Sequence, residues 1–176
     1  GTGYGVPAAW LLQLFPEARV YGIEPDHRRV RVASRVVGKR GAIKVGAAPG
    51  LPDVPEKADT AMILDVIHML SDEDLRLTLA GLREKLCVGG RLVLRATLSG
   101  VPGAAQQKHI VFKRLIEVTR VRIFKGLCDF RTEERLRDII EGSGFEVTAV
   151  EQSAPGHEEF WFVSRVKEAS SNRAQG

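Results

Sequence analysis

Three glycines at alternate positions open the sequence and are followed at once by a helical pattern. Gly1, Gly3 and Gly5 form a GxGxG turn. Because glycine has no Cβ, such a turn lets the backbone approach a ligand closely and directs amide N–H groups at it. A dinucleotide fingerprint (GxGxxG) needs a glycine at position 6, where this chain has Val6. The turn by itself fits a simple tight connection into a helix equally well.

An acidic residue about 20 positions further on could complete a nucleoside site. Glu24 ends an expected strand, where its carboxylate can accept hydrogen bonds from both ribose hydroxyls. Taken alone, Glu24 could equally be a solvated charge or a helix cap. Combined with the glycine turn and the strand–helix–strand context, it favours a nucleoside-binding site.

Asp65 and His68 follow the fully apolar strand expected at 60–64 and are the third set of residues that could take part in chemistry. His68 is the candidate general base, because imidazole exchanges protons near neutral pH. The alternative for His68 is a packing role at the entry to a helix. The aspartates at 53, 59 and 65 are too scattered to argue for a magnesium site.

Short apolar runs alternate with helical patterns along the chain, which predicts an α/β domain. The expected fold is a Rossmann-like, mostly parallel sheet with helices on both faces and a C-terminal antiparallel hairpin. Expected helices cover residues 6–15, 27–37, 71–86, 109–118 and 132 to about 142; expected strands cover residues 19–24, 42–45, 60–64, 91–96, 145–151 and 159–166. One domain over residues 1–166 would account for the pattern, and residues 167–176 form a polar tail with no expected structure.

Composition excludes several classes of protein. In 176 residues, 44% are hydrophobic and 27% charged, a globular balance that rules out a disordered or collagen-like chain. No apolar run reaches the roughly 18 residues of a membrane span. Cys87 and Cys128 stand far apart without zinc-ligand spacing, so a reducing, cytoplasmic setting is expected and no metal site. The net charge of +4 permits an anionic partner without requiring one.

Several motifs in consecutive order resemble those of class I S-adenosylmethionine-dependent methyltransferases, in particular the small-molecule, type 11/12-like members. The matching segments are GTGYG at 1–5, GIEPD at 22–26, DVIHML at 65–70, VGGRLV at 88–93, FRT at 130–132 and GFEV at 144–147. The resemblance implies that S-adenosylmethionine is the cofactor. It also implies that the glycine turn passes beneath its methionine part, that Glu24 holds its ribose, and that Asp65 lies near the methyl group.

Two departures from that family pattern bear on the site. The family has an acid in the loop after the third strand to hold the adenine amino group, whereas this chain has Ala47 and Ala48, leaving only the backbone of Ala48 to serve there. The family's first strand would lie upstream of Gly1, so the resemblance leads us to expect that the natural protein continues N-terminally.

The acceptor is less constrained than the cofactor. No N-P-P-Y-type tetrad follows the strand at 60–64, and no Pro-Cys pair is present, so methylation of nucleic-acid bases is disfavoured. Basic residues interleaved with apolar ones over 108–125 could meet an anionic or membrane-surface substrate, or could form a lid packed on its own core.

We therefore expect methyl transfer to a small-molecule or lipid-like acceptor. One alternative is a catalytically silent methyltransferase-like module of a larger protein. Another is a nicotinamide-dependent oxidoreductase, against which Val6 and the C-terminal hairpin argue.

Overall fold

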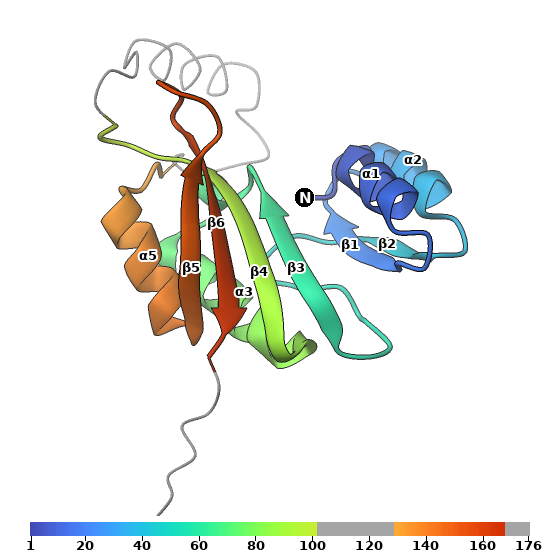
Figure 1. Cartoon of the computed structure of the whole chain (residues 1–176). Coiled ribbons are helices and arrows are strands. Elements are labelled where there is room, and N and C mark those ends of the chain that lie inside the picture. Colours follow the sequence, from blue (N-terminus) through green and yellow to red (C-terminus); the bar gives the residue numbers. More distant parts are fainter. Residues whose placement is uncertain (102–128, 168–176) are drawn as a thin grey trace, which may run out of the picture.

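A computed structural model describes residues 1–101 and 129–167 (Figure 1). In chain order its elements are α1 (Val6–Leu14), β1 (Val20–Glu24), α2 (His27–Val37), β2 (Gly41–Val45), β3 (Ala58–Leu64), the 3-10 helix η1 (Ile67–Met69), α3 (Asp72–Lys85), β4 (Leu86–Thr97), α5 (Glu133–Gly142), β5 (Phe145–Gln152) and β6 (Glu159–Val166). The strands form two sheets, one of two strands and one of four.

The smaller sheet pairs β1 with β2 in parallel, and α1 and α2 pack together over it (Figure 1). α1 begins with Pro7 in its first turn, where a missing N–H costs no helical hydrogen bond. α2 begins after Asp26, whose carboxylate accepts hydrogen bonds from the backbone N–H groups of Arg28 and Arg29 at 2.7 and 3.2 Å. The buried core here is small and aliphatic, comprising Ala8, Leu12, Ala33, Val37 and Ile43.

The larger sheet has the strand order β3-β4-β6-β5. β3 and β4 run parallel, and β6 runs antiparallel to both β4 and β5. β5 and β6 are consecutive and form the expected hairpin. α3 and α5 contact each other and cover this sheet, burying Leu75, Leu79, Leu92, Leu94, Leu136, Ile139, Ile140, Phe145 and Phe162. Ser71 and Thr132 cap the two helices by accepting hydrogen bonds from Asp74 N–H and Arg135 N–H.

The expected fold class is confirmed: β1 with β2 and β3 with β4 pair in parallel, and the antiparallel pairs all involve β6, which forms the hairpin with β5. Strand β4 is longer than the expected 91–96. Leu86 pairs with Ala58, the chain then loops out through Gly89, where φ is +70°, and pairing resumes between Arg91 and Thr60.

Two expectations fall on residues that the structure does not describe, namely the helix at 109–118 with the membrane contact at 108–125, and most of the tail after residue 166. Within the described residues, no helix has the length and apolarity that crossing a bilayer demands.

Candidate functional site

The glycine turn is bonded directly to the carboxyl end of β1. The N–H of Thr2 donates to the carbonyl oxygen of Ile23 at 3.0 Å. The N–H of Gly3 donates to Oε2 of Glu24 at 2.9 Å. The turn and the acidic residue that sequence analysis paired therefore lie in contact, at the edge where doubly wound sheets bind ligands.

The three glycines meet different surroundings. A Cβ on Gly5 would lie 3.0 Å from Cα of Ala33, so its role is the close packing of the turn on α2. A Cβ on Gly1 would collide with the side chain of Val66. A Cβ on Gly3 would meet no described atom within 4 Å, so the turn is open at that point and can accept a ligand against its backbone.

Glu24 is buried, with 3% of its surface exposed. Its Oε1 accepts a hydrogen bond from the N–H of Asp26 at 3.2 Å, and Nη1 of Arg29 lies 3.8 Å away. Burial excludes the solvated-charge alternative for Glu24, and the α2 cap is Asp26 instead. Each carboxylate oxygen takes one backbone N–H and keeps a further lone pair, so the group retains capacity for two hydroxyls.

Ala47 and Ala48 belong to the loop after β2. This loop begins beside Glu24, since the N–H of Gly46 donates to the carbonyl oxygen of Glu24 at 3.2 Å. Ala47 is exposed and Ala48 half-buried. The loop therefore starts from the same edge as the glycine turn.

Asp65 directly follows β3 and has an unusual backbone conformation. Its φ of +56° lies in the left-handed region, where the Cβ of a non-glycine residue raises the free energy of the backbone. Residues held in such conformations cluster at functional sites. Its Oδ1 lies 3.2 Å from Nε of Arg95, without the alignment of a hydrogen bond, so the contact is an attraction between charges. Val66, the next residue, is the one that approaches Gly1.

His68 lies in η1, three residues beyond Asp65. Its ring stacks on that of Phe130 with centroids 5.6 Å apart and planes 18° from parallel. Burial lowers the pKa of His68; the negative charge of Asp65 opposes this, and the positive charge of Arg131 adds to it. The imidazole is thus held in its neutral form, the form that a general base requires.

Arg131 is a residue to which sequence analysis assigned no role. Its side chain is fully buried, although arginine is mostly exposed in proteins, and it is bonded to the segment that carries His68. The only sequence signal was its place in the Phe130–Thr132 motif.

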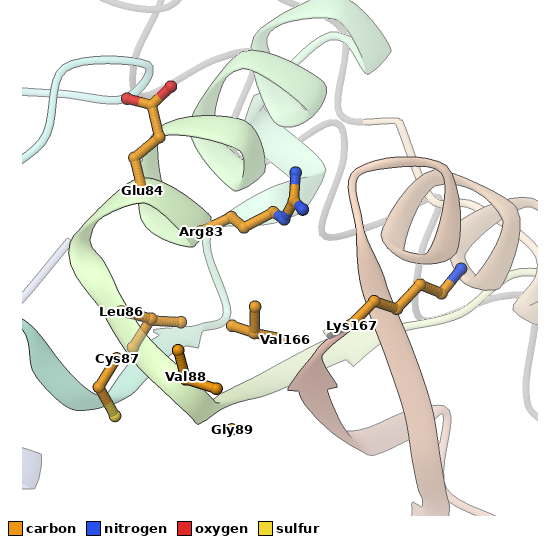
Figure 2. A pocket seen from close by; sticks show the side chains of 8 residues that line it. All are labelled: Arg83, Glu84, Leu86, Cys87, Val88, Gly89, Val166 and Lys167. Atoms are coloured by element: carbon orange, nitrogen blue, oxygen red, sulfur yellow. The ribbon is translucent and has the colours of Figure 1, made fainter. Parts of the chain in front are cut away.

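A cavity in the described part of the chain lies elsewhere. It has a volume of about 610 Å³ and is formed at the end of α3, the start of β4 and the end of β6 (Figure 2). In Figure 2 Arg83 lies on the α3 side of the cavity and Lys167 on the β6 side. Because β3 and β4 are parallel, the cavity lies at the amino end of β4, whereas Asp65 follows the carboxyl end of β3, at the opposite end of the four-stranded sheet. Ligands of doubly wound sheets bind at the carboxyl ends, so we place the site there and not in this cavity.

No group of three His, Cys, Asp or Glu side chains that could hold a metal ion occurs in the described residues.

Comparison with known proteins identifies the family. A family model described as "Methyltransferase domain" matches residues 1–90, half of the chain. The chain belongs to the S-adenosylmethionine-dependent methyltransferases. An uncharacterized methyltransferase of Bacillus thuringiensis is 28% identical over 135 residues, which is 73% of this chain and 60% of that protein. The chain thus spans less than two thirds of the curated relatives it matches.

Solved methyltransferases share the fold. The mitomycin 7-O-methyltransferase MmcR aligns with a TM-score of 0.72 and 22% identity, covering 94% of this chain and 47% of MmcR. Human N-acetylserotonin methyltransferase, solved with S-adenosylmethionine, aligns with a TM-score of 0.65 and 16% identity, covering 96% and 46%. The cofactor expected from the sequence is therefore that of the family.

Proposed function

We propose that this methyltransferase domain transfers a methyl group from S-adenosylmethionine to a hydroxyl of a small molecule. The observation that carries the proposal is the hydrogen bond of 2.9 Å between the open glycine turn and the buried carboxylate of Glu24, at the carboxyl edge of β1. Two proteins of similar structure are named for small-molecule acceptors, mitomycin and N-acetylserotonin, which supports an acceptor of that class.

The residues divide the work by position. Glu24 is proposed to accept hydrogen bonds from the ribose, with Gly1, Gly3 and Gly5 beneath the methionine part and Ala47 and Ala48 beside the adenine. Asp65 is proposed to face the methionine moiety. The cofactor supplies a methyl group that is already activated, so positioning of the acceptor is the main task of the protein.

His68 is the proposed general base. A neutral imidazole can take the proton of an acceptor hydroxyl, and burial keeps His68 neutral. A lipid-like acceptor and a cytoplasmic location for the protein stay predictions. The membrane-surface contact through 108–125 also stays a prediction, and it falls outside the described residues.

A catalytically silent module is the second candidate, and Ala47 favours it. An alanine at this position offers no acceptor for an adenine amino group, so a domain with weakened affinity could have kept the fold without turnover.

Calorimetric titration separates the candidates. Binding of S-adenosylhomocysteine, but not of NAD, together with transfer of a labelled methyl group to hydroxylated aromatic compounds, supports the proposal. Binding without transfer to any such compound or to lipid suspensions supports the silent module, and failure to bind S-adenosylhomocysteine contradicts the site.

We propose residues 1–166 as the domain. A chain ending at residue 166 should therefore bind S-adenosylhomocysteine as tightly as the 176-residue chain does.

A further inference from the structure

Arg131 makes contacts with every part of its guanidinium group. Its Nε donates to Oδ1 of Asp72 at 2.7 Å. Its Nη1 donates to the carbonyl oxygens of Ile67 and Asp129 at 2.9 and 3.4 Å. Its Nη2 donates to the carbonyl oxygen of Leu70 at 2.7 Å and lies 3.7 Å from Oδ2 of Asp129. The five N–H groups of arginine thus face five oxygen atoms.

The carbonyls of Ile67 and Leu70 lie on either side of His68 in the chain. Ile67 precedes it and Leu70 follows two residues later, so one planar group holds both ends of the short turn that carries the imidazole. The same arginine binds the carbonyl of Asp129, whose N–H donates to the carbonyl oxygen of His68 at 2.9 Å. Phe130, between Asp129 and Arg131, stacks on the imidazole ring.

Only arginine can make this set of bonds. Lysine carries three donors on a single atom and cannot reach carbonyls on several sides at once. A buried cation also requires a compensating anion, which Asp72 supplies, since its side chain is only 20% exposed. A purely apolar residue would fill the space and leave the carbonyls of Ile67 and Leu70 without these partners.

We propose that Arg131 is a positioning residue for His68: it joins the η1 turn to the start of α5 and so fixes the imidazole against Phe130. The inference rests on the proposed function only in treating His68 as the base. The arrangement of the imidazole can be measured without turnover, so the two proposals can fail separately.

Arg135, four residues further along the chain in α5, provides a matched control. It binds the same aspartate, with Nε and Nη2 at 3.0 and 2.7 Å from Oδ2 of Asp72. Its side chain is 54% exposed, and it makes no recorded bond to residues 67–70. Replacing Arg135 therefore perturbs Asp72 without removing the bonds to the η1 turn.

The test compares Arg131→Lys with Arg135→Lys in the full chain. Proton NMR follows the titration of His68, and hydrogen exchange follows the amide of Asp129. For Arg131→Lys, which keeps the charge, we expect the pKa of His68 to rise toward its ordinary value as the turn opens to water, and the Asp129 amide to exchange at least tenfold faster. Arg135→Lys should leave both within twofold of the wild type. A folded Arg131→Lys protein with the wild-type titration and exchange would overturn the proposal.

Kinetics distinguish positioning from general weakening. We expect Arg131→Lys to lower kcat at least tenfold while the Kd for S-adenosylhomocysteine stays within twofold, because Arg131 makes none of its hydrogen bonds with the residues proposed to hold the cofactor. Should Arg131→Lys fail to fold, Asp72→Asn against Arg135→Gln decides the matter. A change in His68 titration with Asp72→Asn alone supports the proposal, and equal behaviour of the two refutes it. If wild type transfers no methyl group, the proposed function fails, while the NMR comparison still tests the positioning.

Discussion

The N–H of Gly3 lies 2.9 Å from Oε2 of Glu24, so the glycine turn that opens the chain and the acid that ends β1 form one unit. Two features follow from this bond. The carboxylate is oriented before any ligand arrives, and the turn is held at the sheet edge by an interaction with a charged acceptor, a stronger kind of hydrogen bond than one between neutral groups.

Replacement of Glu24 should therefore affect both binding and stability. For Glu24→Ala we expect cofactor affinity to fall by about 10–150-fold, or roughly 1.5–3 kcal/mol, the scale of hydrogen bonds to a charged group. The free energy of unfolding should fall by about 1–3 kcal/mol, because the N–H groups of Gly3 and Asp26 lose their acceptor. Calorimetry and denaturant titration measure the two effects, with the exposed Glu17→Ala as control. A less than twofold change in affinity in a folded protein would remove Glu24 from the site.

Alanine at two of the glycines should separate packing from binding. Gly5→Ala places a Cβ 3.0 Å from the backbone of α2 at a φ of +87°, so we expect a loss of about 2–4 kcal/mol of stability. Gly3→Ala has a φ of +59° but no described neighbour within 4 Å, so it should cost only about 1–2 kcal/mol. Its new methyl group would occupy the open side of the turn and weaken S-adenosylhomocysteine binding at least tenfold.

Gly89→Ala is the control for this pair. Gly89 has a φ of +70° and likewise no described neighbour within 4 Å, but it lies in the β4 loop near the distant cavity. Gly89→Ala should lower stability about as much as Gly3→Ala does, without weakening the binding of S-adenosylhomocysteine. Equal loss of affinity at positions 3 and 89 would mean that the turn does not contact the cofactor.

Local features of the sequence predicted the structure well, and long-range ones did not. The starts of the helices expected from residues 27, 71 and 132 agree with the structure, where Asp26, Ser71 and Thr132 are the N-caps, because a cap depends on the two or three residues that follow it. Arg131 had no such signal, since its partners Asp72 and Ile67 lie 59 and 64 residues away in the chain. For the same reason the burial of Glu24 was not foreseeable: it arises from a turn 21 residues earlier folding over it.

An acid at position 47 tests the register of the loop after β2. If Ala47 faces the adenine, Ala47→Asp should tighten S-adenosylmethionine binding by about 0.5–1.5 kcal/mol, the worth of one added hydrogen bond. The gain should vanish with an analogue in which the 6-amino group of adenine is replaced by oxygen, because that analogue has no amino donor. Unchanged affinity for both compounds would place residue 47 away from the base.

The protonation of His68 should determine the acid limb of the pH profile of kcat/KM for methyl transfer. Burial lowers its pKa, so the neutral base persists to pH values below the ordinary histidine pKa of about 6.5. The limb of kcat/KM should accordingly lie on the acid side of 6.5. Stability should follow the same group: as pH falls through about 6.5 the unfolded chain takes up a proton that the folded chain resists, so the free energy of unfolding decreases.

Replacement of Asp65 should shift the pKa of His68 in a known direction. The negative charge of Asp65 raises the pKa of His68 against the effect of burial. Asp65→Asn removes that charge while keeping a side chain that tolerates a φ of +56°, so the pKa of His68 should fall further and the acid limb should move to lower pH. Asp138→Asn, an exposed change on α5, should leave both unchanged. NMR titration of His68 beside the pH profile of kcat/KM measures the two quantities together. A His68 pKa that falls while the acid limb stays in place would show that another group is the base.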